Sequence, residues 1–267
     1  SVSGANRFKA APPLQPWTGV RDALQFGAPS FQPGQRRNEP PMAEDCLFLN
    51  VWTPAIDKRK RPVMFYSHGG GFTSGSAASA YQDASGLART FDVVVVSTNH
   101  RLGLMGSLVL RALGGEEYAT SGNQGLLDIR DALKWVHDNI EAFGGDPANV
   151  MIFGESGGGA KTSCLYAMPS AAPYFHKASI ESGPGIRILP PEAAAETALM
   201  TLKHLGIEKA AWRKILEVPA DQLIAAQNAV GRTGGGPLTM SGGRRGIGGG
   251  GRPGGFGPVV DGTVLPH

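Results

Sequence analysis

A serine flanked by glycines lies where a predicted strand meets a predicted helix. Residues 154–158 read Gly-Glu-Ser-Gly-Gly, which matches the pattern G-x-S-x-G with Ser156 at its centre. A serine on so sharp a turn needs small neighbours, and the turn exposes its hydroxyl above the sheet, at the N-terminus of the helix. The pattern predicts that Ser156 is a nucleophile. A turn that binds a phosphate, or that only packs, is the alternative for the pentapeptide alone.

A second glycine-rich run lies upstream of the serine and follows another predicted strand. Residues 68–71 read His-Gly-Gly-Gly. Glycines let backbone N–H groups point into a site without side chains blocking the approach, as stabilisation of the negative charge on an attacked carbonyl oxygen requires. A flexible turn is the alternative. Because the two runs occur in this order, separated by a strand and a helix, the sequence predicts a serine hydrolase.

Strands and helices alternate around these two runs. Strands are predicted over residues 47–52, 62–68, 92–98, 150–153 and 177–182. Apolar residues recur at spacings of three and four over 126–140, and a second helix is predicted from about Ser156 to Met168. Alternation of this kind predicts an α/β fold with a mostly parallel central sheet flanked by helices. Residues 1–42, rich in proline and glycine, are predicted to be irregular.

Composition excludes several classes of partner. The 267 residues carry a formal charge of +3, which does not favour nucleic acid or an acidic membrane surface as the main partner. No apolar run approaches the roughly 20 residues that span a membrane. Cys46 and Cys164 lie far apart, so no metal site or disulfide framework is expected, and no cofactor is implied. No leader opens the chain, and the compartment stays open, with secretion or the periplasm among the alternatives.

The chain changes character beyond Pro190. Helices are predicted over residues 191–204 and 209–229. Residues 231–257 are about half glycine with four arginines, and are predicted to form a flexible loop or linker. Residues 258–267 look structured again. Arginines among glycines resemble RNA-binding tails, but Phe256 is the one aromatic residue there, so stacking on bases would be weak and a solvated loop is favoured.

Many ordered motifs resemble the type-B carboxylesterases, a family with the α/β-hydrolase fold that includes bacterial carboxylesterases and the cholinesterases. They are residues 44–52, 68–72, 99–103, 122–128 and 143–147, the Ser156 turn, and the pair Ser182-Gly183. The resemblance implies hydrolysis of a small-molecule carboxylic ester through an acyl-enzyme on Ser156. It implies an oxyanion hole from the N–H groups of Gly70, Gly71 and Gly157, and Phe72 is a candidate substrate-binding residue.

The chain departs from this family's pattern in length and in detail. Members are about twice as long, and their C-terminal half supplies the acid and the histidine of the triad, in the order Ser, Asp/Glu, His. The resemblance therefore implies that residues 1–230 and 258–267 belong to one incomplete α/β-hydrolase domain whose C-terminal half is a partner. Gly157 replaces the usual alanine. Where the family often has a cysteine that pairs with the one matching Cys46, this chain has Ser30, so Cys46 is expected to be a buried free thiol.

The chain offers no histidine with a motif that would complete the site. His176, His204 and His267 follow Ser156, and each is interpreted as a surface residue. The triad acid and histidine are therefore predicted to lie outside this chain. Because a serine hydroxyl without a base is a weak nucleophile, activity of the chain alone is left open. A non-catalytic interaction protein of the same fold is the alternative function, and the retained Ser156 argues against it.

Overall fold

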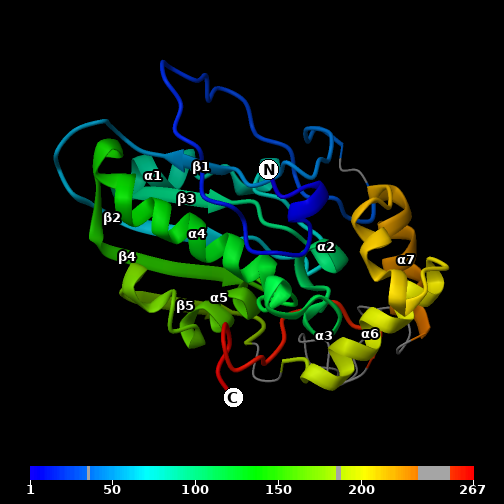
Figure 1. Ribbon diagram of the computed structural model, residues 1–267. Helices are drawn as coiled ribbons and strands as arrows, with labels where there is room; N and C mark the ends of the chain where they lie inside the picture. Colours follow the sequence, from blue (N-terminus) through cyan, green and yellow to red (C-terminus); the bar gives the residue numbers. More distant parts are fainter. Residues whose placement is uncertain (35–36, 185–187, 234–252) are drawn as a thin grey trace.

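A five-stranded sheet forms the centre of the protein (Figure 1). The computed structural model describes residues 1–34, 37–184, 188–233 and 253–267. The strands are β1 (Leu49–Trp52), β2 (Arg61–Ser67), β3 (Val94–Thr98), β4 (Gly145–Glu155) and β5 (Lys177–Glu181), in the order β1-β3-β2-β4-β5. All neighbouring pairs are parallel except β1 with β3. The predicted α/β class and mostly parallel sheet are confirmed.

The helices lie between and beyond the strands. The α-helices are α1 (Ser85–Phe91), α2 (Gly103–Ser107), α3 (Arg111–Gly114), α4 (Gln124–Asn139), α5 (Gly157–Ala167), α6 (Pro191–His204) and α7 (Ala220–Thr233). Short 3-10 helices are η1 (Gly4–Asn6), η2 (Ala80–Gln82), η3 (Gly115–Tyr118), η4 (Ile140–Phe143), η5 (Ala172–Tyr174) and η6 (Lys209–Leu216). The prediction of one helix over 209–229 is wrong. Pro219 separates η6 from α7, because proline has no N–H to continue a helix but fits just before its first turn.

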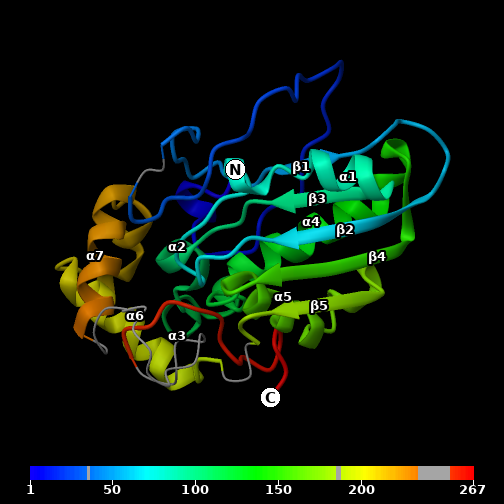
Figure 2. The ribbon, with the colours of Figure 1, turned by 180° about the vertical axis from the view of Figure 1, so that it is seen from behind.

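The two faces of the sheet differ in how completely they are buried. On the covered face, α4 and α5 pack against six strand residues that are at most 1% exposed: Val63, Phe65, Val94, Val96, Val150 and Ile152. On the open face, α1 covers Val95 and part of Met64. The neighbouring Tyr66 and Phe153 stay half-buried there, with their rings 5.0 Å apart. Figure 2 shows β2 and β4 from the open face, with α4 and α5 behind them.

A second hydrophobic cluster lies at the side where the carboxyl ends of β2 and β3 point. It joins α2 to α6, η6 and α7 around Leu104, Leu202, Trp212 and Leu223. The side chain of Gln227 on α7 reinforces this contact, because its Oε1 accepts a hydrogen bond from the backbone N–H of Leu104 at 2.7 Å. These contacts therefore attach the helices beyond Pro190 to α2, the helix that follows β3 in the chain.

The last residues of the chain pack on the same core as the sheet. Val259 exchanges two hydrogen bonds with the Asn123 side chain, at 2.8 and 2.9 Å, and Val264 and Leu265 are buried in the cluster of the covered face. Most of the predicted Gly/Arg-rich loop, residues 234–252, lies outside the described residues. Residues 231–233, assigned to that loop, instead complete α7. The predicted division into 1–230, 231–257 and 258–267 otherwise stays a prediction.

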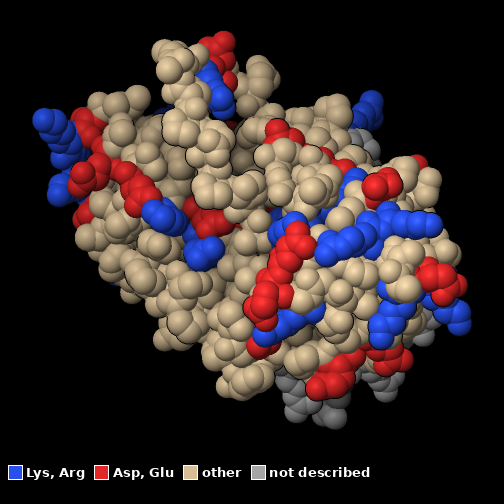
Figure 3. Space-filling view, viewed as in Figure 1, with Lys and Arg blue, Asp and Glu red and all other residues tan. Residues whose placement is uncertain are grey.

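The buried groups of the protein include both cysteines and an ion pair. Cys46 is free and buried, as predicted, and Ser30 lies within hydrogen-bonding reach of its thiol. Cys164 is also free and buried. The Arg101 guanidinium pairs with the Asp128 carboxylate at 2.6 Å, with both side chains almost fully buried. On the face shown in Figure 3, Lys and Arg are interspersed with Asp and Glu. No helix in the described part of the chain is long and apolar enough to cross a bilayer.

Candidate active site

The backbone at Ser156 is held in a strained conformation. β4 ends at Glu155 and α5 begins at Gly157, so Ser156 alone makes the turn, with φ 58° and ψ −120°. A non-glycine residue with positive φ costs free energy and persists where its surroundings hold it. Here the Ser156 N–H donates to the Glu181 carbonyl at 2.9 Å, and its carbonyl accepts from the Ala160 N–H at 3.1 Å. The predicted sharp strand-to-helix turn is present.

The glycines around Ser156 are required by close backbone contacts. A Cβ atom added to Gly154 would lie 2.7 Å from the Ser67 carbonyl oxygen, and one added to Gly158 would lie 2.1 Å from the same atom. At Gly159 it would lie 2.4 Å from the Glu181 carbonyl oxygen. Side chains at these positions would push α5 away from the ends of β2 and β5. The glycine pattern therefore keeps the serine close to the carboxyl ends of the strands.

The glycine-rich loop, residues 68–71, lies directly beside this turn. β2 pairs in parallel with β4, and the partner of Gly154 is Ser67, so both strands end at the same edge. Gly70 and Gly71 have φ values of 92° and 62°, which glycine adopts without strain. A Cβ added to Gly157 would lie 2.1 Å from the Gly71 nitrogen, so the loop backbone touches the start of α5. The structure brings Ser156, Gly70, Gly71 and Gly157 together.

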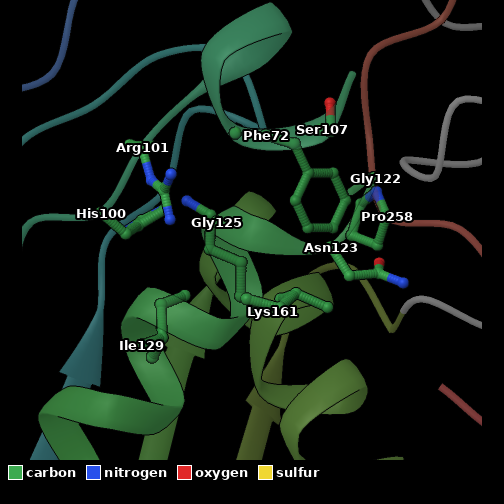
Figure 4. Close-up of a pocket in the computed structure, with 12 residues that line it drawn as sticks. Phe72, His100, Arg101, Ser107, Gly122, Asn123, Gly125, Ile129, Lys161 and Pro258 are labelled. Carbon is green, nitrogen blue, oxygen red and sulfur yellow. The ribbon is translucent and has the colours of Figure 1, made fainter. Parts of the chain in front are cut away.

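Phe72 follows the glycine-rich loop and lines a small cavity behind it. Its side chain is half-buried against the core of the covered face, and its carbonyl accepts a hydrogen bond from the Gly103 N–H at 2.7 Å. His100, Asn123 and Lys161 line the same cavity (Figure 4). Contact between Phe72 and a substrate stays a prediction.

The histidines that follow Ser156 in the chain lie elsewhere. The His176 Nδ1 accepts a hydrogen bond from the Val150 N–H at 3.2 Å. Val150 lies five residues before Glu155, the last residue of β4, so His176 lies away from the end of β4 that leads into Ser156. His204 is the last residue of α6, and His267 lies against Gly262. In the described parts of the chain, none of these three histidines hydrogen-bonds to Ser156. The triad acid and histidine outside this chain stay a prediction.

Sequence reasoning missed Lys161, which is completely buried beneath the glycine-rich loop. Its Nζ donates a hydrogen bond to the His68 carbonyl at 2.8 Å. Burial lowers the Lys161 pKa to about 7, because the charged form loses its hydration. The His100 ring stacks on the His68 ring, and burial and the nearby Lys161 hold the pKa of His100 well below its ordinary value. Lys161 is the one charged residue in α5, and that was the available signal.

The described residues contain no cluster of three or more His, Cys, Asp or Glu side chains arranged to hold a metal ion.

Comparison with known proteins then decides the family. The model of the Carboxylesterase family matches residues 2–267. The chain belongs to the carboxylesterase family. This membership confirms the resemblance drawn from the ordered motifs of the sequence.

Relatives with named functions support the family and show how much of it this chain spans. The chain is 42% identical over 228 residues to the para-nitrobenzyl esterase of Bacillus subtilis, which covers 84% of the chain and 46% of that relative. It is 38% identical over 220 residues to the cholinesterase of Mus musculus, covering 77% of the chain and 36% of the relative. The chain spans about half the length, or less, of these curated relatives.

A solved structure gives the same result for the fold. The carboxylesterase of Geobacillus stearothermophilus superposes with a TM-score of 0.87 at 40% sequence identity, covering 100% of this chain and 51% of that one. The α/β-hydrolase fold is therefore confirmed, and the chain contains one part of it.

Proposed function

We propose that this carboxylesterase-family chain carries the nucleophile and the oxyanion hole of a serine carboxylesterase. The observation that carries the proposal is the strained Ser156 turn with the Gly71 nitrogen against Gly157. A serine at the start of a helix, beside a loop of glycines in left-handed conformations, suits attack on a carbonyl carbon and stabilisation of the oxygen that becomes negative.

The proposed reaction has two steps. The Ser156 Oγ attacks the ester carbonyl while a histidine removes its proton, and the N–H groups of Gly70, Gly71 and Gly157 stabilise the oxyanion. The same histidine then protonates the departing alcohol, which leaves an acyl group on Ser156. Water attacks this acyl-enzyme in the second step and releases the carboxylic acid. Because donors placed for the tetrahedral state act mainly on the transition state, the loop should raise kcat more than it lowers KM.

The histidine and its acidic partner are proposed to come from a C-terminal half that joins the open face and β5. Among the described residues, β5 pairs only with β4, and its apolar residue Ile180 is 39% exposed. An unpaired strand edge that carries apolar residues is a site for further pairing. Half-buried Tyr66 and Phe153 on the neighbouring open face also lack full cover. A segment that extends the sheet beyond β5 fits these observations.

A non-catalytic interaction protein of the same fold is the second candidate. The observation in its favour is that none of the three histidines after Ser156 bonds to it in the described residues. The glycines around Ser156 favour an enzyme. A binding surface alone would not need a serine in a strained backbone at the ends of the strands.

Hydrolysis of a short-chain p-nitrophenyl ester tests the proposal, with Ser156→Ala as the matched variant. The native protein, defined by intact mass and peptide sequencing, should hydrolyse the ester, and Ser156→Ala should lose at least about 10⁴-fold in kcat. The chain 1–267 alone should be nearly inactive and should gain turnover when the C-terminal half is added.

Three outcomes would contradict parts of this proposal. Rapid, Ser156-dependent turnover by the chain alone would show that a base within it completes the site. A native protein that ends at His267, has no co-purifying partner and is active would exclude the second half. A native protein without Ser156-dependent turnover would leave the non-catalytic alternative.

A further inference from the structure

Lys161 joins the helix behind the nucleophile to the first residue of the glycine-rich loop. It is the fifth residue of α5, and its side chain is 0% exposed. The Nζ atom donates to the His68 carbonyl at 2.8 Å, across a sequence separation of 93 residues. Figure 4 shows the side chain extending from α5 toward the side of the cavity where His100 and Arg101 lie.

Among the residues that the structure describes, no carboxylate offsets the charge of this lysine. His68 and His100 stack beside it, and Arg101 on the cavity wall is already paired with Asp128. An uncompensated ammonium in such surroundings is costly, and the fall of the Lys161 pKa to about 7 is caused by burial alone. A lysine that only filled space could be replaced by an apolar residue at a gain in stability. The cost therefore points to a role in the site.

The other end of the loop is held by separate contacts. The Ser74 N–H donates to the Gly70 carbonyl at 3.1 Å, and the Gly75 N–H donates to the Gln32 side chain at 2.8 Å. Gly69, Gly70 and Gly71 have no side chains of their own to fix their positions. Residues 68–71 are therefore held at one end by Lys161 and at the other by these bonds.

We propose that Lys161 is a positioning residue that fixes the glycine-rich loop against α5 and so sets the N–H groups of Gly70 and Gly71 for the oxyanion. This inference rests on the proposed function for its effect on catalysis. The position of the loop itself does not depend on that function. Displacement of an oxyanion donor by a fraction of an ångström weakens a hydrogen bond that matters most in the transition state.

Two measurements on Lys161→Met, in the native full-length protein, test this inference. Amide hydrogen exchange over residues 66–75 should be several-fold faster in the variant, because the bonds of Ser74 and Gly75 report opening of the loop. In ester hydrolysis, kcat per titrated active site should fall about 10-fold to 100-fold with KM within about 3-fold of the wild type. Lys161→Gln serves as the test variant if Lys161→Met does not fold.

Cys164→Ala is the matched control, because Cys164 lies on the same helix, is 1% exposed and does not contact the loop through a hydrogen bond. It should lower the melting temperature while loop exchange and kcat per active site stay as in the wild type. Unchanged loop exchange in folded Lys161→Met would overturn the inference. A wild type without esterase activity would refute the proposed function, and loop exchange would still decide the role of Lys161.

Discussion

The two faces of the central sheet have different degrees of burial although they are built from the same strands. On the covered face, Phe65 of β2 and Ile152 of β4 are 0% exposed beneath α4 and α5. On the open face, the next residues of the same strands, Tyr66 and Phe153, stay half-buried with their rings 5.0 Å apart. In a parallel sheet both faces are normally covered.

The difference teaches which part of the fold this chain completes by itself. The covered face and the turn at Ser156 are assembled from residues of this chain. The open face and the β5 edge lie where the chain, which spans about half of its relatives, supplies no further cover in the described residues. The stability of the isolated chain should therefore come mainly from one side of the sheet.

Matched phenylalanine truncations on the two faces test this comparison and should give the largest effect. Phe65→Ala should lower the free energy of unfolding by about 3–5 kcal/mol, as expected for a fully buried ring. Phe153→Ala should cost only about 1–2 kcal/mol in the isolated chain, because less of its surface leaves water on folding. Urea denaturation at one pH measures both values.

Equal costs for these two variants would show that the open face is already well packed. The comparison becomes sharper in the presence of the C-terminal half. The cost of Phe153→Ala should then rise, whereas that of Phe65→Ala should stay the same.

The pH dependence of the free energy of unfolding should show the effect of burying Lys161. The pKa of Lys161 falls from its ordinary 10.5 to about 7 on folding. Between these two values the unfolded chain holds a proton that the folded chain has released, so rising pH favours the folded state. The free energy of unfolding of the wild type should thus increase relative to Lys161→Met from about pH 7 to 10. Denaturation curves at several pH values give this difference, and a constant or falling difference would contradict the buried lysine.

Hydrogen exchange along the sheet should show the smallest contrast. Amides of β5 should exchange faster than those of β3, because β5 is an exposed edge and all five residues of β3 are buried. Addition of the C-terminal half should slow exchange in β5 and leave β3 unchanged. Equal protection of the two strands in the chain alone would argue against an open edge.

Much of this architecture could be predicted from the sequence because short stretches of residues determine it. The apolar run at Val94 and the glycines around Ser156 each indicate an element without knowledge of its neighbours. The contact of Lys161 with His68 could not be predicted in this way, since it joins residues 93 positions apart. The break at Pro219 carried a local signal, but helical periodicity on either side of it concealed the boundary.

The two buried cysteines have a practical consequence for labelling the protein. Cys46 and Cys164 are each 1% exposed, and burial raises the pKa of both thiols to about 12. Because the thiolate is the form that reacts, maleimide reagents should leave both unmodified in the folded protein. Tyr81 is 100% exposed, so Tyr81→Cys would introduce a single reactive thiol. A fluorophore could be attached there without first removing either native cysteine.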